Sequence, residues 1–292
     1  MNEYDDPAIV DFNFGPNGER SKLRENGRNR YRDVHCQKRR RVTLTWPPGN
    51  NSDYIHANYV GTPVSDRRFV CTQGPTRNTV FDFWRLVIQE GTDTIVMLCN
   101  CIEKGIEKCA PYWPYKEKET ANFDGIEVIN ELVSPIAPDE TAIRVTILTL
   151  KWMEGEEKKE REIRHYQWVD WPDRGIPSIK LSAVSLLARA RETTKPIVAH
   201  CSAGIGRTGT VVAIEYLFER FQSGIPYESM IDIVRGIRDQ RAYCIQMDLQ
   251  YVFIHRLMLF YFFEKLKLAQ TEENKTLYTK FSREYNCYAG SF

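Results

Sequence analysis

The sequence predicts a mixed fold of the α/β or α+β class. Short runs rich in β-branched residues alternate along the chain with longer segments in which apolar residues recur every three or four positions. These patterns continue from Tyr54 to Leu268 without a repeat, a Gly/Ser linker or a change of composition. Although 292 residues would also allow two domains, the unbroken pattern favours a single domain.

Each predicted element follows from its local pattern. Strands are expected where β-branched and other apolar residues alternate or run together, at 68–72, 94–99, 126–132, 143–151, 162–169 and 196–200. Helices are expected where apolar residues keep a helical spacing, at 80–89, 181–192, 208–221, 228–240 and 247–268. Residues 152–164 contain EGEEKKER between two strands and predict a hairpin with a charged, solvated tip. Residues 269–292 form a polar tail whose order the pattern does not determine.

Composition excludes several classes of function. Lys and Arg number 40 against 39 Asp and Glu, so a net charge of +1 provides no overall field for nucleic acid or an anionic membrane. Attraction for anions must therefore be local, and the basic run at 21–41 is interpreted as a solvated face. The longest apolar stretch, 257–263, is far shorter than the ~20 residues of a membrane span.

The amino terminus and the cysteines indicate the compartment. The first residues have neither the basic start nor the apolar run of a signal peptide. Eight cysteines in such a chain are expected to be reduced thiols, so we expect a cytoplasmic location. Cys99, Cys101 and Cys109 do not predict a zinc site, because no histidine or CxxC motif completes four ligands. The sequence does not indicate the oligomeric state.

The most informative segment, Cys-Ser-Ala-Gly-Ile-Gly-Arg, lies between the predicted strand at 196–200 and the predicted helix at 208–221. A glycine-bearing turn that feeds a helix points backbone N–H groups into one concavity, and the helix dipole adds positive potential there. Such a loop binds phosphate. The same donors would lower the pKa of Cys201 below the free value of ~8.5 and make it a nucleophile. Arg207 supplies a planar guanidinium that can hold two phosphate oxygens.

Two other interpretations of this loop are weaker. Gly204, Gly206 and Gly209 spell GxGxxG, the dinucleotide-binding pattern. About 20 residues further on, where that pattern requires an acidic residue closing a second strand, residues 227–235 have helical spacing instead. Burial as a small core residue is the commonest state of a free cysteine, but the glycines and Arg207 beside Cys201 favour a reactive thiol.

The segment His200-Cys201-Ser202-Ala203-Gly204-Ile205-Gly206-Arg207-Thr208-Gly209 resembles the signature of the classical, phosphotyrosine-specific protein tyrosine phosphatases. Further motifs follow in the family's order over about residues 29–265. The resemblance implies a catalytic domain over 1–268, formed by a highly twisted mixed β-sheet flanked by helices, with the phosphate-binding loop between a strand and a helix. It implies no metal and no cofactor. The loop residues that it assigns to phosphate binding are Ser202, Ala203, Gly204, Ile205, Gly206 and Arg207.

Two further motifs resemble the loops that surround the family's pocket. Trp171-Pro172-Asp173, which alone would be a simple turn, resembles the mobile loop whose aspartic acid is held protonated above the pocket and protonates the leaving oxygen. Arg174 follows it, where the family usually has an aromatic residue or histidine. The segment 28–33 resembles the recognition loop, in which Tyr31 flanks the phosphotyrosine ring and Asp33 accepts hydrogen bonds from the substrate backbone.

The remaining motifs resemble supporting segments. Gln246 and Gln250 lie in a segment similar to the glutamine loop, whose first glutamine positions the hydrolytic water, although Met247 and Ala242 depart from the usual pattern. The segment 103–114 resembles the one whose glutamate pairs with the signature arginine and whose lysine contacts the acid loop. The residues that correspond to these two are Glu103 and Lys108.

The resemblance implies two-step hydrolysis of phosphotyrosine in proteins. Cys201 attacks phosphorus while Asp173 protonates the tyrosine oxygen, and water placed by Gln246 then cleaves the phosphocysteine. The hydroxyl of Thr208 stabilises the departing thiolate, and His200 tunes it from behind. The implied partners are phosphotyrosine-containing proteins.

Two alternatives stay open from the sequence. The departures at 174, 242 and 247 would also suit a phosphotyrosine-binding module with feeble turnover. A phosphatase for phosphoserine or phosphoinositides would share the cysteine loop and need a shallower or wider pocket.

Overall fold

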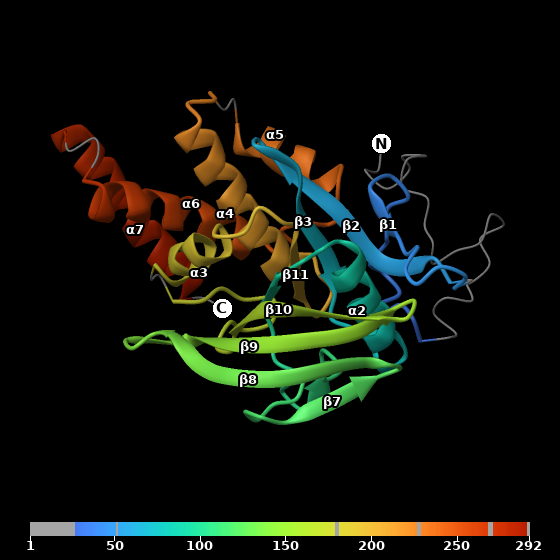
Figure 1. Cartoon of the computed structure of the whole chain (residues 1–292). Coiled ribbons are helices and arrows are strands. Elements are labelled where there is room, and N and C mark those ends of the chain that lie inside the picture. The colour runs from blue at the N-terminus through green and yellow to red at the C-terminus, as the bar shows by residue number, and fades with distance from the viewer. Residues whose placement is uncertain (1–26, 51, 179–180, 227–228, 268–270, 291–292) are drawn as a thin grey trace.

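A nine-stranded β-sheet forms the centre of the molecule (Figure 1). The computed structural model describes residues 27–50, 52–178, 181–226, 229–267 and 271–290. The first residues, which lack the features of a signal peptide, and the first part of the basic run lie outside the described residues. In chain order the strands are β1 (Arg41–Thr43), β2 (Tyr54–Thr62), β3 (Ser65–Gln73), β4 (Thr94–Met97), β5 (Ile102–Glu103), β6 (Ile106–Glu107), β7 (Thr120–Phe123), β8 (Ile126–Ala137), β9 (Glu140–Glu154), β10 (Glu157–Trp168) and β11 (Ile197–Cys201).

The helices gather mainly on one side of the sheet. They are η1 (Arg77–Thr79), α2 (Val80–Gln89), α3 (Ser182–Ala190), α4 (Gly206–Gln222), α5 (Met230–Arg238), α6 (Asp248–Phe260), the π-helical turn η2 (Tyr261–Lys265) and α7 (Glu272–Ala289). Figure 1 shows α3 to α7 clustered together, with α2 apart from them. No helix in the described part of the chain is long and apolar enough to span a bilayer.

Strand direction explains where the functional loop lies. The sheet order is β1-β2-β3-β11-β4-β10-β9-β8-β7, with β5 and β6 forming a separate hairpin. The four central strands β3, β11, β4 and β10 run parallel, and the outer pairs are antiparallel. Parallel strands place their carboxyl ends at one edge, where ligands commonly bind in open α/β sheets. Cys201 ends β11 at that edge.

The segment after β11 is held by the core on both sides. All five residues of β11 are buried, and α4 is buried on almost every face along its first three turns. A helix that is buried all round lies inside a domain rather than on its surface. The four residues between Cys201 and Gly206 are therefore anchored at both ends by buried elements.

The structure confirms the expected single domain with a mixed sheet and helices. Every strand and helix predicted above is present, and the charged hairpin is formed by β9 and β10, whose strands extend nearly to the turn at Gly155. The short strands β1, β5, β6 and β7 and the long strand β2 were not predicted. Part of the polar tail forms α7. None of the eight cysteines, all in the described part of the chain, forms a disulfide.

Candidate active site

The loop after β11 requires glycine at its tightest point. Gly204 has φ of +70°, and a Cβ there would lie 2.0 Å from the carbonyl oxygen of Thr72. Its backbone N–H donates to Cys201 Sγ over 3.2 Å. Because glycine has no side chain, the backbone can adopt this conformation and place the amide N–H of Gly204 against the sulfur.

The other glycines of the GxGxxG pattern serve packing. A Cβ on Gly209 would lie 2.5 Å from the backbone nitrogen of Ile245, and one on Gly206 would approach the amide groups of Gln246 and Gln250. The carbonyl of Ile205 accepts hydrogen bonds from Gly209 N at 2.9 Å and Ile245 N at 3.0 Å. These glycines let α4 lie against the segment that carries both glutamines.

Cys201 has the environment of a thiolate. Burial raises the pKa of this thiol, but the Arg207 guanidinium, the hydroxyl and N–H of Thr208 and the N–H of Gly204 together hold the pKa below its usual value. Thr208 Oγ1 is buried with no other hydrogen-bond partner among the described residues. By contrast, burial raises the pKa of Cys71 and of Cys244. The loop therefore favours the charged form of the Cys201 sulfur.

Arg207 is held in a fixed orientation above the loop. Its Nη1 and Nη2 donate to Glu103 Oε1 and Oε2 over 2.6 and 3.0 Å, and Nη1 also donates to the carbonyl of Trp171 over 2.9 Å. Burial by itself lowers the pKa of Arg207. The carboxylate of Glu103 and the thiolate of Cys201 have the larger, opposite effect, so the pKa lies above its usual value. The guanidinium is 2% exposed and its counter-ion 11%, so this pair is largely shielded from solvent.

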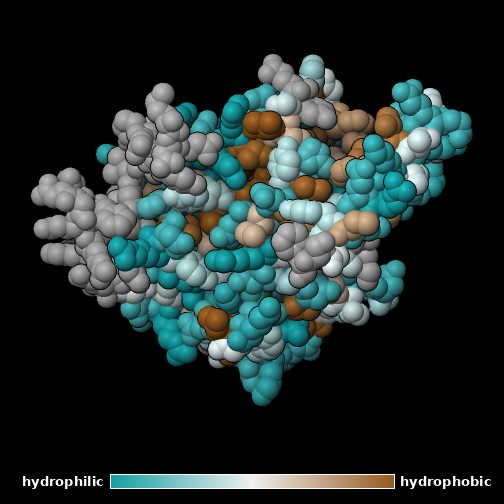
Figure 2. All heavy atoms as spheres, turned by 180° about the vertical axis from the view of Figure 1, so that it is seen from behind, coloured by the Kyte–Doolittle hydropathy of each residue, from teal (hydrophilic) through white to brown (hydrophobic). Residues whose placement is uncertain are grey.

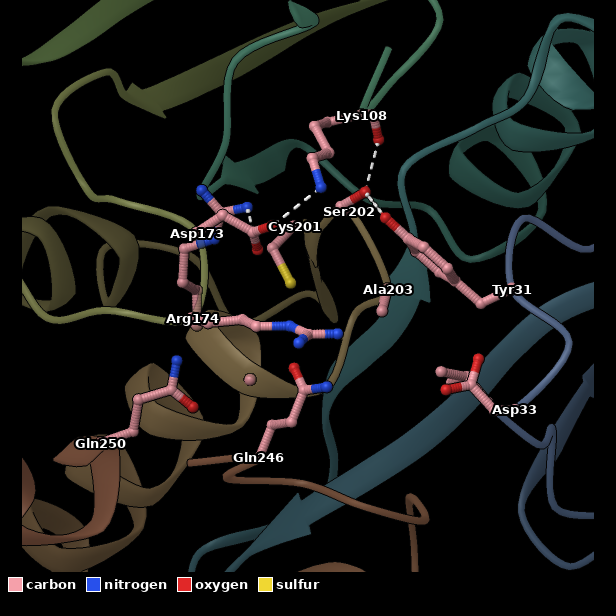
Figure 3. A pocket seen from close by; sticks show the side chains of 13 residues that line it. Tyr31, Asp33, Lys108, Asp173, Arg174, Cys201, Ser202, Ala203, Gln246 and Gln250 are labelled. Carbon is pink, nitrogen blue, oxygen red and sulfur yellow. Dashed lines mark hydrogen bonds and ion pairs between the residues drawn. The ribbon is translucent and has the colours of Figure 1, made fainter. Parts of the chain in front are cut away.

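Asp173 closes the pocket from the opposite side. Its Oδ2 accepts from Lys108 Nζ over 2.8 Å, as Figure 3 shows. Its Oδ1 accepts from Arg207 Nη2 over 3.3 Å. Burial raises the pKa of this carboxyl, but Lys108, Arg207 and Arg174 together hold it below its usual value. The resemblance implies a protonated acid at this position. The pocket without substrate instead favours the ionised form, because two cations contact the carboxylate.

Tyr31 and Asp33 form the facing wall. Ser202 Oγ donates to the carbonyl of Lys108 over 3.0 Å, so the Tyr31 hydroxyl donates to Ser202 Oγ over 2.7 Å. This contact fixes the tyrosine ring at the edge of the loop. Asp33 is exposed and lines the same pocket, together with Ala203 at the base. Figure 3 shows both side chains on the side of the pocket opposite Asp173.

The two glutamines lie below the loop. Gln246 and Gln250 both line the pocket. Gln250 is fully buried; its Oε1 accepts from Met247 N over 3.2 Å and its Nε2 donates to the carbonyl of Gly175 over 3.4 Å. Gln250 therefore ties the start of α6 to the loop that carries Asp173. Gln246 is the glutamine whose side chain is directed toward the pocket interior in Figure 3.

His200 lies behind the nucleophile in a buried chain of hydrogen bonds. Its Nδ1 donates to the carbonyl of Cys201 over 3.1 Å, so its Nε2 accepts from the Tyr112 hydroxyl over 2.8 Å. The Tyr112 oxygen in turn accepts from His165 Nε2 over 2.7 Å. Burial lowers the pKa of His200 to about 4 and that of His165 to about 3, so both rings are neutral. His200 thus acts on the carbonyl of Cys201 and contributes no charge.

Arg241 is a supporting residue that the sequence analysis missed. This fully buried guanidinium donates to the carbonyls of Ala203 and Gly204 over 3.1 Å each. It also donates to Asn58 Oδ1 over 2.8 Å. Because the loop carbonyls point to Arg241, the loop amides are left free to face the pocket. No local pattern could reveal this, since the partners of Arg241 lie 37 or more positions away in the chain.

Within the described residues, the structure brings the predicted site residues to one place, and most of them line the pocket. Five support the site without lining the pocket: Gly204 and Thr208 contact Cys201, Glu103 contacts Arg207, His200 contacts the carbonyl of Cys201, and Ile205 binds the backbone of Gly209 and Ile245. No group of three or more His, Cys, Asp or Glu side chains in that part of the chain is arranged to hold a metal ion.

Comparison with known sequences points to one family. The profile of the protein-tyrosine phosphatase family matches residues 25–260. The chain is 37% identical over 240 residues to the Lar-like tyrosine-protein phosphatase of Caenorhabditis elegans and 35% identical over 240 residues to the human receptor-type tyrosine-protein phosphatase F. Both matches cover 80% of this chain but 10% and 12% of those proteins, so the chain spans about a tenth of the length of these relatives.

Solved structures agree with this result. The crystal structure of the catalytic domain of human protein tyrosine phosphatase non-receptor type 18 (PTPN18) has a TM-score of 0.71 and 31% identity, covering 78% of this chain and 82% of that one. A PTPN18 complex with a HER2 phosphopeptide has a TM-score of 0.75 and 30% identity, covering 83% and 90%. The fold, the cysteine loop and these matches together show that the chain belongs to the protein-tyrosine phosphatase family.

Proposed function

We propose that this domain hydrolyses phosphotyrosine in proteins through a phosphocysteine on Cys201. One observation carries the proposal: a thiol with a lowered pKa lies at the base of a pocket that Asp173 closes from the opposite side. Figure 3 shows the sulfur of Cys201 directed into the space between Asp173 and Tyr31. Nucleophile, acid and phosphate-binding arginine therefore face a single bound group.

In the first step the Cys201 thiolate attacks phosphorus and the tyrosine oxygen leaves. Arg207 and the loop amides take the non-bridging oxygens, while Asp173 gives its proton to the leaving oxygen. A phosphate dianion bound to Arg207 competes for one of the two cations that contact Asp173 in the pocket without substrate, and its own charge repels the carboxylate. Substrate binding thus raises the pKa of Asp173 and supplies the protonated acid where it is needed.

In the second step water attacks the phosphocysteine. Gln246 lines the pocket beside Cys201 and is placed to orient this water, while Asp173, now ionised, accepts its proton. The hydroxyl of Thr208 and the N–H of Gly204 stabilise the departing thiolate, as they do in the resting protein. Asp173, Thr208 and Gly204 therefore act in both halves of the reaction.

The wall formed by Tyr31 supports an aromatic substrate. Its hydroxyl is fixed by Ser202, so the ring stands at the edge of the loop and adds depth to the pocket. A phosphoserine side chain is shorter and gains no contact with such a ring. The PTPN18 complexes with HER2 phosphopeptides support a phosphotyrosine-containing protein as the partner. Because the chemistry needs a free thiol, we place this activity in a reducing compartment such as the cytoplasm, where it would act in phosphotyrosine signalling.

Trapping the intermediate tests the proposal. Purified protein is mixed with a phosphotyrosine peptide, quenched in acid within milliseconds and analysed by mass spectrometry. We expect one phosphoryl group on Cys201, followed by steady release of phosphate, and no adduct in the Cys201→Ser variant. A burst without steady release would instead indicate a binding module. Equal rates with matched phosphoserine and phosphotyrosine peptides would show that the pocket does not select the aromatic ester.

A further inference from the structure

Arg174 is a pocket residue to which the mechanism assigns no role. It follows the acid Asp173, is exposed, and lines the same pocket as Cys201 and Gln246. In Figure 3 its side chain runs from the acid loop into the space between Cys201 and Gln246, with the guanidinium at its far end. The loop therefore delivers two side chains to the pocket, a carboxylate and a guanidinium.

The backbone around Arg174 is anchored. Arg174 has φ of +58°, a left-handed conformation that side chains other than Gly, Asn and Asp seldom adopt. Gly175 N donates to the carbonyl of Pro172 over 3.1 Å, which closes the turn around it. The carbonyl of Gly175 accepts from Trp171 Nε1 over 3.0 Å. An unfavourable conformation that its neighbours hold in place at a pocket is typical of a functional position.

The charges of the pocket leave Arg174 available for a ligand. Glu103 and Asp173 contact Arg207, and Asp173 also contacts Lys108. Within the described part of the chain, the Arg174 guanidinium forms neither a hydrogen bond nor an ion pair. The two carboxylates nearest the loop thus neutralise Arg207 and Lys108, and the positive charge of Arg174 has no contact partner.

We propose that Arg174 forms an anion subsite beside the phosphate-binding loop, so that the domain prefers substrates with a second anionic group next to the phosphotyrosine. This inference rests on the proposed phosphotyrosine phosphatase function. A planar guanidinium binds a carboxylate or a phosphate through two parallel N–H donors. The second group is therefore an acidic side chain or a second phosphate of the same peptide.

Matched peptides test the subsite. Phosphotyrosine peptides that differ at one flanking position carry Glu, Gln or phosphothreonine there, and each flanking position is varied in turn. We expect kcat/KM to be about fivefold to tenfold higher with Glu than with Gln at one position, and higher again with phosphothreonine, as for a charge-assisted contact. The preference should fall with added salt, because the subsite is open to solvent.

Variants assign the preference to one side chain. In Arg174→Gln the ratio of kcat/KM between the Glu and Gln peptides should fall to about one, and Arg174→Lys should retain part of it. Arg32→Gln removes the same charge from an exposed position in the neighbouring loop that does not line the pocket, and should keep the preference. Loss of the preference in both glutamine variants would show a general field effect and overturn the subsite.

Two further results would overturn the role of Arg174 while leaving the proposed function intact. One is turnover without any preference for the anionic peptides. The other is an equal loss for all peptides in Arg174→Gln, with weaker competitive inhibition by inorganic phosphate, since Arg174 would then contact the reacting phosphate itself. Absence of turnover with every peptide contradicts the proposed function instead. In that case the subsite is tested by the affinities of the Cys201→Ser variant for the same peptides, which should be higher for the Glu peptide than for the Gln peptide; equal affinities would overturn it.

Discussion

At the scale of single residues, the chemistry depends on two side chains whose pKa values are both lowered. Asp173 contacts the Arg207 guanidinium directly, and Cys201 is stabilised as a thiolate by the charge of the same guanidinium. Both side chains therefore favour the ionised form in the pocket without substrate. The first step needs the thiolate but a protonated carboxyl. Substrate binding must therefore lead to protonation of Asp173 while Cys201 remains a thiolate.

Replacing Asp173 by Asn tests its acid role. The amide keeps the size of the side chain but cannot protonate a leaving oxygen, so kcat for a phosphotyrosine peptide should fall by about 10²–10⁴. Formation of phosphocysteine from an aryl phosphate whose leaving group is a weak base should fall much less, since that leaving group needs no proton. Rapid-quench kinetics with both substrates measure this difference. An equal loss with both would assign Asp173 to substrate binding alone.

Replacing Lys108 by Met tests why the carboxyl is ionised. The Lys108 contact at 2.8 Å is one of the interactions that lower the pKa of Asp173. Without this contact, less opposes the effect of burial, so the pKa of Asp173 should rise and a larger fraction of the carboxyl should be protonated at a given pH. Titration of the Asp173 carboxyl carbon by NMR, in both proteins, measures the shift. A pKa that does not rise would mean that Arg207 and Arg174 keep the carboxyl ionised without Lys108.

At the scale of elements, the geometry of the cysteine loop depends on contacts from distant segments. Arg241 takes the loop carbonyls and Glu103 takes the Arg207 guanidinium, yet these residues lie far from Cys201 in the sequence. The strand before the loop and the helix after it are buried and provide the frame. The loop therefore has its shape because two separate segments, those of Glu103 and Arg241, satisfy its polar groups.

Replacing Arg241 by Met should disturb the loop through its carbonyls. The buried oxygens of Ala203 and Gly204 lose their donor, which costs about 2–5 kcal/mol of unfolding free energy. The loop amides should also turn from the sulfur, so the pKa of Cys201 should rise. Thermal unfolding and the pH dependence of alkylation by iodoacetamide measure the two effects. Arg161→Met is the control, because Arg161, on β10 and outside the pocket lining, also donates to two backbone carbonyls, those of Val87 and Thr92. It should lower stability and leave the alkylation profile unchanged.

The elements that could be predicted are those whose own sequence carries the signal. Strand β9 alternates buried and half-buried residues, and α4 keeps its apolar spacing, so each is apparent from a short window. Strand β2 is buried on both faces and places His56 and Asn58 in the core, which removes the alternation. Cys201 and Arg207 could be predicted from the glycine-bearing turn between a strand and a helix, whereas the other residues of the pocket could be predicted only through the resemblance of their motifs. Arg241 belongs to no such motif, and its role follows from tertiary contacts alone.

At the scale of the whole molecule, the site lies at one edge of the sheet and combines residues from distant parts of the chain. The residues that line the pocket extend from Tyr31, before β1, to Gln250, in the first turn of α6. Cooperative unfolding should therefore remove the site and the fold together. Helix α7 differs, because Tyr285 is its one buried side chain among the described residues.

Helix α7 should open independently of this cooperative unit. It is held mainly by Tyr278, whose hydroxyl accepts from Arg256 Nη1 over 2.8 Å and whose ring stacks on Phe263 with centroids 4.7 Å apart, and by the buried ring of Tyr285. So few contacts predict local opening at lower free energy than global unfolding. In the double variant Tyr278→Ala and Tyr285→Ala, the amides of α7 should lose protection from hydrogen exchange, while those of β11 and α4 keep theirs and the unfolding midpoint changes little. Equal loss of protection in β11 would show instead that α7 belongs to the unit that holds the cysteine loop.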